Sequence, residues 1–307
     1  MRTAFISHDD CELHDMDYGH PESPARLSAI KNQLQDSRLI QELDFIRADE
    51  VKKDHVTRVH PNSYFEQLDM LSPTRGRIMI DSDTMMMKDT MRAAKLAAGA
   101  AVQAVDLVMS GQYETAFCAT RPPGHHAERN TAMGFCFYNN VAVAARHALS
   151  FHGLERVAII DFDVHQGNGT VDIFENDPAV MFCSSFQHPC YPNSHYAVQS
   201  DNIVNTPLEA HSKSIDFRNK TEKDWLNRLQ DHKPQLILIS AGFDAHKDDP
   251  MANINLVEDD YRWVTQMLKD VASNYADDRV VSLLEGGYNL KALGQSVEAH
   301  LETLSDA

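Results

Sequence analysis

Short apolar segments recur along the chain, and turn-forming or polar residues follow each of them. The segments are rich in β-branched and aromatic residues and lie at Thr3–Ser7, Thr115–Ala119, Val157–Asp161, Val180–Ser184, Gln235–Ala241 and Val280–Glu285. A strand that is buried on both faces of a parallel sheet has this nearly continuous apolar character, because helices cover both faces. The pattern therefore predicts a buried strand at each of these positions.

Between the predicted strands, apolar residues recur at helical spacing. Two clear stripes run from Ala94 to Val108 and from Tyr261 to Val271, and a capping-box pattern from Thr221 to Asp224 predicts the start of another helix. Alternating strands and helices predict one α/β domain over residues 1–307, with a mostly parallel sheet of about eight strands and helices on both faces. In such sheets, binding sites form at the carboxyl ends of the strands.

The chain is acidic, with 45 acidic and 28 basic residues and a formal net charge of −17. Acidity of this size repels phosphate backbones, which argues against nucleic-acid binding and is compatible with a cationic substrate. The five cysteines form no CxxC pair, which argues against a disulfide framework or a cysteine-ligated zinc. The first residues become polar too early for a signal peptide, and no apolar run approaches the length of a membrane span, so we expect a cytoplasmic protein.

Metal-competent side chains follow two of the predicted strands. Asp161, Asp163 and His165 alternate along the chain, so their side chains share one face of an extended strand, and Asp244 follows another strand. Such groups are costly to leave unpaired at the end of an apolar strand, and a cation would compensate them. Asp163, His165 and Asp244 leave an open coordination position, as a catalytic zinc requires, and they also suit iron(II). The alternative is that the acids cap helices and that His165 is an ordinary buried histidine.

The ends of other predicted strands carry groups that suit amide hydrolysis. His125 and His126 follow a rigid proline turn, where one could act as a general base while the other supports charge. Tyr288 follows two glycines and could donate its hydroxyl to an oxyanion, and Phe135 could line a pocket. Each feature alone also fits a surface loop, a turn or core packing. Their combination predicts metal-assisted amide hydrolysis.

Several long motifs occur in the order known for one enzyme family. They are GHPESPARL, RPPGHHA, GFCFYNN, DFDVHQGNGT, AGFDAH and LEGGYN, and together they extend over almost the whole chain. The chain thereby resembles the histone deacetylase and acetylpolyamine amidohydrolase family, of the arginase–deacetylase fold, and its class II-like bacterial members in particular. The resemblance implies zinc-dependent hydrolysis of N-acetylated amines to acetate and free amine. The implied substrate is acetyl-lysine in proteins or peptides, and the alternative substrate is a small acetylated polyamine.

The resemblance also implies a role for each candidate site residue. The implied zinc ligands are Asp163, His165 and Asp244. His126 would be the general base and later the acid to the leaving amine, oriented by Asn168, while His125 would stabilise charge and be oriented by Asp161. Tyr288 would polarise the scissile carbonyl together with zinc. Many relatives have aspartate where this chain has Asn168, and the asparagine should make His126 less basic.

By the same resemblance, Phe135 would form one wall of a tunnel for the acyl-lysine, near Gly134 and Gly287, and Tyr191 is the candidate for the opposite wall. A structural potassium ion would be bound by backbone carbonyls and serines. The residues implied for it are Asp161, Asp163, His165, Ser184 and Ser185. A second alkali-metal site would lie around Phe174, Asp177 and Val180.

Two other classes of protein are compatible with parts of the pattern. An arginase-like manganese enzyme would use two metals and more aspartates, whereas the motifs here fit a single zinc. A non-catalytic binding module would not need the histidine pair or Tyr288. The short segment from Met70 to Met87 favours a class II-like deacetylase over polyamine enzymes that carry a longer insertion there. A homo-oligomer is also possible.

Overall fold

The computed structural model describes residues 3–198 and 200–306. Its main feature is an eight-stranded sheet in the order β2-β1-β5-β10-β9-β6-β7-β8, in which every neighbouring pair is parallel. The strands are β1 (Thr3–Ser7), β2 (Leu43–Arg47), β5 (Thr115–Cys118), β6 (Val157–Asp161), β7 (Val180–Gln187), β8 (Ile203–Leu208), β9 (Ile237–Ala241) and β10 (Val280–Leu284). The predicted parallel sheet of about eight strands is therefore confirmed.

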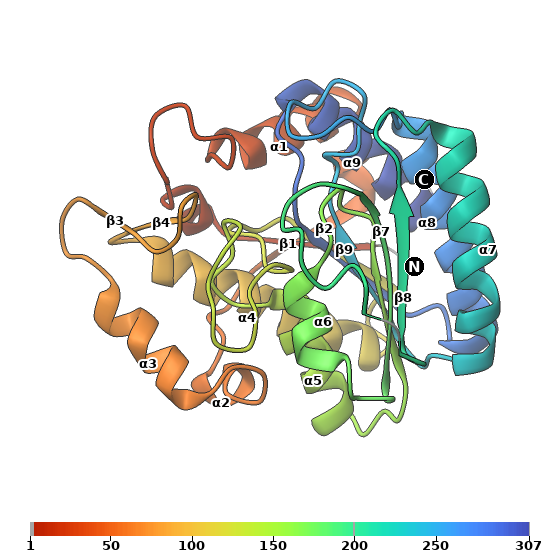
Figure 1. Ribbon diagram of the computed structural model, residues 1–307, viewed down its shortest axis with the longest axis horizontal. Helices are drawn as coiled ribbons and strands as arrows, with labels where there is room; N and C mark the ends of the chain where they lie inside the picture. Colours follow the sequence, from red (N-terminus) through yellow and green to blue (C-terminus); the bar gives the residue numbers. More distant parts are fainter. Residues whose placement is uncertain (1–2, 199, 307) are drawn as a thin grey trace.

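Helices cover both faces of this sheet, because successive strand residues point to opposite sides. Leu238 of β9 belongs to a core cluster with residues of α4 and α5, whereas Ile239 belongs to a second cluster with residues of α1, α7, α8 and α9. Figure 1 shows α4 and α5 to the left of β7 and β8, and α7 and α8 to their right. These helices are α1 (Ala25–Asp36), α4 (Thr90–Met109), α5 (Asn140–Ser150), α7 (Ser214–His232), α8 (Glu258–Tyr275) and α9 (Leu290–Ser305).

Shorter elements lie in the connections between the main strands and helices. They are two 3₁₀ helices at Asp9–Glu12 and Leu39–Glu42, the helices α2 (Lys53–Val56), α3 (Asn62–Leu71) and α6 (Asn168–Phe174), and the antiparallel hairpin of β3 (Arg77–Met79) with β4 (Met85–Met87). No helix within residues 3–198 and 200–306 combines the length and the apolar character needed to cross a bilayer.

The helix predicted to start at Thr221 begins earlier, so that prediction is wrong. Helix α7 starts at Ser214, where the Lys213 backbone N–H donates to the Asp216 carboxylate at 2.9 Å. Thr221 is buried inside the helix, and its hydroxyl donates to the Phe217 carbonyl at 2.7 Å. The first two turns of α7 carry mostly polar residues, so the spacing of apolar residues did not indicate where the helix starts.

Candidate metal centre and catalytic site

The candidate chemistry lies where four neighbouring strands end. The strands β5, β10, β9 and β6 are adjacent in the sheet and parallel, so their carboxyl ends reach the same edge. The candidate residues that follow them are His125 and His126 after β5, Tyr288 after β10, Asp244 after β9, and Asp163 and His165 after β6. Strand order thus brings together residues that are more than a hundred positions apart in the chain.

Asp163, His165 and Asp244 form a compact buried triad. His165 Nδ1 lies 3.0 Å from Asp163 Oδ1 and 3.2 Å from Asp244 Oδ2. The three potential ligand atoms all lie within 4.8 Å of one another. Their spacing suits three ligands of one ion, with room left for a further ligand.

Backbone groups hold the two carboxylates of the triad in place. The Gly286 N–H donates to Asp163 Oδ2 at 2.8 Å, and the Val164 N–H donates to Asp244 Oδ1 at 2.9 Å. Gly286 must be a glycine, because a Cβ there would lie 2.1 Å from Asp244 Oδ2 and 2.6 Å from Asp163 Oδ2. The turn after β10 therefore packs directly against the triad.

The triad fits a divalent cation. Asp244 Oδ2 is buried and faces His165, but it makes no hydrogen bond of good geometry within the described part of the chain. Burial raises the pKa of the Asp244 carboxyl, and repulsion from Asp163 raises it further. A bound cation would remove both penalties, because it offsets the paired negative charges and takes up the free lone pair. One imidazole and two carboxylates suit zinc or iron(II).

The adjacent histidines lie beside the triad and have different partners. His125 Nδ1 donates to Asp161 Oδ2 at 2.9 Å, whereas His126 Nδ1 donates to Asn168 Oδ1 at 2.7 Å. The His126 ring lies 5.8 Å from the His165 ring. The structure therefore brings both predicted orienting residues against the histidines that they were expected to hold.

The surroundings of the two imidazoles shift their pKa values in opposite directions. Burial lowers the pKa of His125, but the charges of Asp161, Asp163 and Glu285 outweigh it and raise that pKa to about 10. Burial lowers the pKa of His126 well below its usual range, and the neighbouring His125 and His165 charges lower it further. His126 therefore stays neutral, with Nε2 free to accept a proton, while His125 carries a positive charge.

Tyr288 is held by its backbone at the edge of the site. Asp249 accepts the backbone N–H groups of Tyr288 at 2.6 Å and of Asn289 at 3.0 Å. The Tyr288 ring lies 5.0 Å from the Arg26 guanidinium and 6.0 Å from the Phe135 ring. Asp249 was not among the predicted residues, although the Asp-Pro pair shortly after Asp244 marks a turn that returns to the site.

The two aromatic residues expected to line a tunnel each contact a candidate catalytic residue. Phe135 packs against Tyr288, and Tyr191 packs against His126 with ring centroids 5.2 Å apart. Gly134 has a φ of +54°, and a Cβ there would lie 2.5 Å from the His126 ring, so this turn requires glycine. The Gly287 carbonyl accepts from Arg26 Nε at 2.7 Å. Phe135 therefore lies beside Tyr288, while Tyr191 and Gly134 lie beside His126.

A buried network of ion pairs supports the site, and the roles of its residues were not predicted from the sequence. Arg26 Nη2 donates to the Glu285 carbonyl at 2.5 Å, and Glu22 pairs with both Arg26 and Arg121. Burial raises the pKa of Glu22, but the Arg121 charge outweighs it and lowers that pKa to about 2. Glu285 in turn accepts the His125 backbone N–H at 3.1 Å. The GHPESPARL motif therefore anchors both the histidine loop and the Tyr288 loop.

Asn168 has a second partner that was also missed. Its amide Nδ2 donates to Glu128 Oε1 at 2.8 Å, while its Oδ1 accepts from His126. Glu128 lies two residues after the histidine pair, but only the folded loop shows that its side chain returns to Asn168. The Glu128 carboxylate is thus connected to His126 through the side chain of Asn168.

Two regions expected to bind alkali metals differ in their surroundings. Ser184 pairs in register with Asp161, and its buried Oγ has no hydrogen-bond partner in the described part of the chain. The carbonyls of the possible second site already share a protein donor. The Asn202 amide donates to the carbonyl oxygens of Phe174, Asp177 and Val180 at 2.7, 3.1 and 3.0 Å.

The parallel α/β sheet and the buried Asp/His/Asp triad at its carboxyl edge define a metal-dependent hydrolase. Residues 20–304 match the model of the histone deacetylase domain. The chain is 35% identical to the histone deacetylase-like amidohydrolase of Pseudomonas aeruginosa, over 88% of this chain and 73% of that protein. It is 32% identical to the polyamine deacetylase HDAC10 of Mus musculus, over 99% of this chain and 48% of that protein.

A solved structure shows the same architecture. The crystal structure of the HDA15 HD domain superposes with a TM-score of 0.93 at 31% identity, covering 99% of this chain and 88% of that one. The chain therefore belongs to the histone deacetylase family. It is an amidohydrolase of a zinc-dependent family, and the buried triad is its candidate metal site.

Proposed function

We propose that this protein removes the acetyl group from acetylated lysine side chains of proteins or peptides, releasing acetate and a free amine. The observation that carries the proposal is the buried triad with two histidines beside it, of which His126 is neutral and His125 is positively charged. A neutral base, a charged partner and a metal-binding triad at one edge of the sheet are the parts that amide hydrolysis requires.

Each of the chain's own groups has a defined task in this reaction. When zinc is bound, it would polarise the acetyl carbonyl and lower the pKa of the attacking water. His126 Nε2 takes the water proton while Asn168 keeps the imidazole oriented, and His125 supports the negative charge that develops. Tyr288 donates its hydroxyl to the carbonyl oxygen as it becomes an oxyanion. His126 then returns the proton to the departing amine.

Zinc is the proposed metal, and iron(II) is the alternative in the cell, because both accept an imidazole with two carboxylates. We also place a structural potassium ion behind the triad. Its proposed ligands are the backbone carbonyls of Asp161, Asp163 and His165 together with Ser184 and Ser185. The buried Ser184 Oγ supports this proposal, because it has no hydrogen-bond partner among residues 3–198 and 200–306.

An acetylated polyamine is the second candidate substrate. Burial raises the pKa of the Tyr191 hydroxyl most. The negative charges of Asp81, Asp83 and Glu128 raise it further, so these carboxylates lie near Tyr191. Negative charge beside a tunnel attracts a cationic chain, and a mammalian relative bears the name polyamine deacetylase. Lysine-rich peptides would benefit from the same field.

One assay separates the two substrates. We would measure kcat/KM of the zinc-loaded protein for a fluorogenic acetyl-lysine peptide and for N-acetylputrescine under the same conditions. The proposal expects the peptide to be the better substrate. A kcat/KM that favours the polyamine would move the assignment to the second candidate, and no turnover of either would contradict the proposed function.

A further inference from the structure

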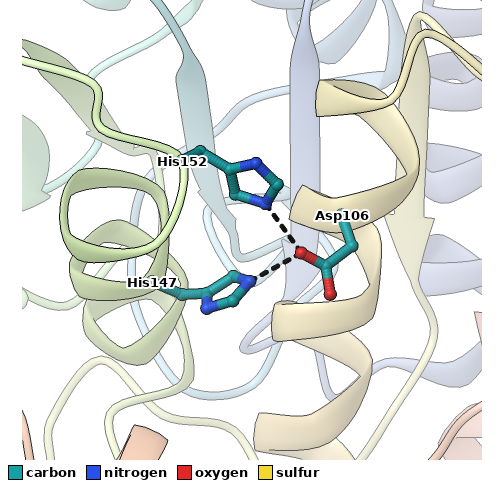
Figure 2. A group of neighbouring side chains, drawn as sticks. All are labelled: Asp106, His147 and His152. Carbon is teal, nitrogen blue, oxygen red and sulfur yellow. Dashed lines mark hydrogen bonds and ion pairs between the residues drawn. The ribbon is translucent and has the colours of Figure 1, made fainter.

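A second cluster of metal-competent side chains lies between α4 and the end of α5. Asp106 projects from α4, His147 from the last turn of α5, and His152 from the turn that follows (Figure 2). Both imidazoles approach the same carboxylate oxygen. His147 Nε2 lies 2.6 Å and His152 Nε2 lies 2.7 Å from Asp106 Oδ1.

This cluster is separate from the catalytic edge of the sheet. His147 and His152 precede the first residue of β6, whereas Asp163 and His165 follow its last residue. The five residues of β6 span about 17 Å. In Figure 1, α5 lies in the lower part of the molecule, while the arrowhead of β8 points up. Because the strands of the sheet are parallel, their carboxyl edge lies above, away from the C-terminal end of α5.

Two buried nitrogen atoms at the cluster have no hydrogen-bond partner in the part of the chain that the structure describes. His147 is buried, and its Nδ1 has no hydrogen bond within residues 3–198 and 200–306. His55 of α2 stands beside it with ring centroids 4.8 Å apart, and its buried Nδ1 is unpaired within the same residues. A cavity of about 290 Å³ opens at this place and is lined by Asp49, Glu50, His55, Asp106, His147 and Phe151 among others.

We propose that Asp106, His147 and His152 bind a divalent transition-metal ion of the zinc type, in addition to the ion of the catalytic centre. Two imidazoles and a carboxylate suit zinc and its neighbours, whereas magnesium and calcium prefer oxygen ligands throughout. Three protein ligands leave one position of a tetrahedral site for water, and the adjoining cavity gives that water access.

The geometry needs only a small adjustment. Ligand atoms around a tetrahedral zinc lie about 3.3 Å apart, so each imidazole must move away from Asp106 Oδ1 by roughly 0.6 Å. The Asp106 side chain is 48% exposed and that of His152 is 19% exposed, so both have room to shift. The more deeply buried His147 would then be the fixed member of the site.

The protonation of His147 is compatible with this change. Burial lowers its pKa, so the imidazole is neutral near pH 7 despite the bond to Asp106. A neutral imidazole presents a lone pair on Nε2 when its proton sits on Nδ1. Because no protein group among the described residues bonds to His147 Nδ1, nothing fixes the other tautomer. The ion thus replaces the hydrogen bond from His147 to Asp106 without requiring a charged His147 to lose its proton.

An ion here would link three segments of the fold. It would join α4 to the end of α5 and to the turn that leads into β6. Because it binds the native state and not the unfolded chain, it would raise the melting temperature in proportion to the logarithm of the free metal concentration. Because the catalytic ion raises the melting temperature in the same way, only the part of this dependence that Asp106→Asn removes belongs to the cluster.

The test is a comparison of zinc stoichiometry by equilibrium dialysis of the metal-stripped, full-length protein. Asp106→Asn and His152→Gln remove a ligand at partly exposed positions, which protects the fold better than a change at His147. We expect each variant to bind one zinc ion per chain fewer than the wild type at the same free zinc. Asp270→Asn, an exposed change of the same kind on α8, should bind as much zinc as the wild type.

Two further readouts complete the experiment. Deacetylase turnover of the zinc-loaded variants should equal that of the wild type, because neither residue lies at the catalytic edge. Anomalous scattering at the zinc edge from wild-type crystals should place a peak among Asp106, His147 and His152. Equal zinc binding by wild type and variants, or the absence of that peak, would overturn the proposal.

Discussion

Individual residues at the site act through the partners that their neighbours supply. His125 and His126 are adjacent in the chain, yet nearby carboxylates, Asp161 first, raise the pKa of His125, whereas burial and neighbouring positive charges lower that of His126. A carboxylate stabilises a neighbouring imidazolium, whereas an amide oxygen fixes the tautomer without adding a full charge. The proposed roles of His126 as base and His125 as charged partner therefore depend on burial and on side chains that lie about forty positions away.

The hydroxyl of Tyr288 is expected to stabilise the transition state and not the bound substrate. Tyr288→Phe keeps the ring and its packing against Phe135 but removes the donor. We therefore expect kcat to fall by ~100-fold or more, as when other oxyanion donors are removed, with a smaller change in KM. Steady-state kinetics on an acetyl-lysine peptide measure this, and near-normal turnover would remove Tyr288 from the mechanism.

Asp249 is expected to act only through Tyr288. Asp249→Ala leaves the backbone N–H groups of Tyr288 and Asn289 without their acceptor, a loss of about 1–3 kcal/mol that loosens the turn. We expect turnover to fall ~10-fold while the zinc content stays unchanged. In a Tyr288→Phe background the same change should have little further effect. Equal losses in both backgrounds would show that Asp249 supports the site by another route.

At the scale of elements, central strands were easier to predict than edges. The strands β5, β6, β9 and β10 are buried on both faces and stand out as apolar runs. The edge strands β2 and β8 mix buried residues with partly and fully exposed ones, and β8 contains a proline, so neither met that criterion. Helix α7 was placed too late for a similar reason, because its first two turns carry mostly polar residues.

A buried histidine links two of these elements and should make stability depend on pH. His60, between α2 and α3, accepts the Asn139 backbone N–H at the start of α5 through Nε2, at 3.0 Å. Burial lowers the pKa of His60 to about 4, so the folded protein keeps it neutral while the unfolded chain takes up a proton below about pH 6.5. Its contribution is therefore present above that pH and is lost as the pH falls towards 4.

We expect the free energy of unfolding to drop by up to about 1.4 kcal/mol per pH unit from this group alone between pH 6.5 and 4. Urea denaturation at several pH values measures the slope. His60→Gln should give a shallower slope, although buried His14 and His300 keep part of it, since burial also lowers the pKa of each, to about 4 and about 3. An unchanged slope would mean that His60 is not held neutral in the folded state.

At the scale of the whole molecule, function depends on strand order more than on chain order. The motifs predicted which strand ends carry metal ligands, base and hydroxyl donor, and the structure places these ends side by side because β5, β10, β9 and β6 are neighbours. Sequence reasoning could not find Asp249, Glu128 or Glu285 as supporting residues. Their partners lie far away in the chain, and only the folded loops bring them within hydrogen-bond distance.

The central claim is that Asp163, His165 and Asp244 hold the one ion on which hydrolysis depends. The most direct measurement is the deacetylase rate of the metal-stripped protein as zinc is added, for the wild type and for Asp244→Asn. We predict no turnover without metal, recovery of the wild type with zinc, and almost none in the variant at the same free zinc, since one of three ligands is lost. Turnover by the metal-free protein, or a variant as active as the wild type, would contradict the account.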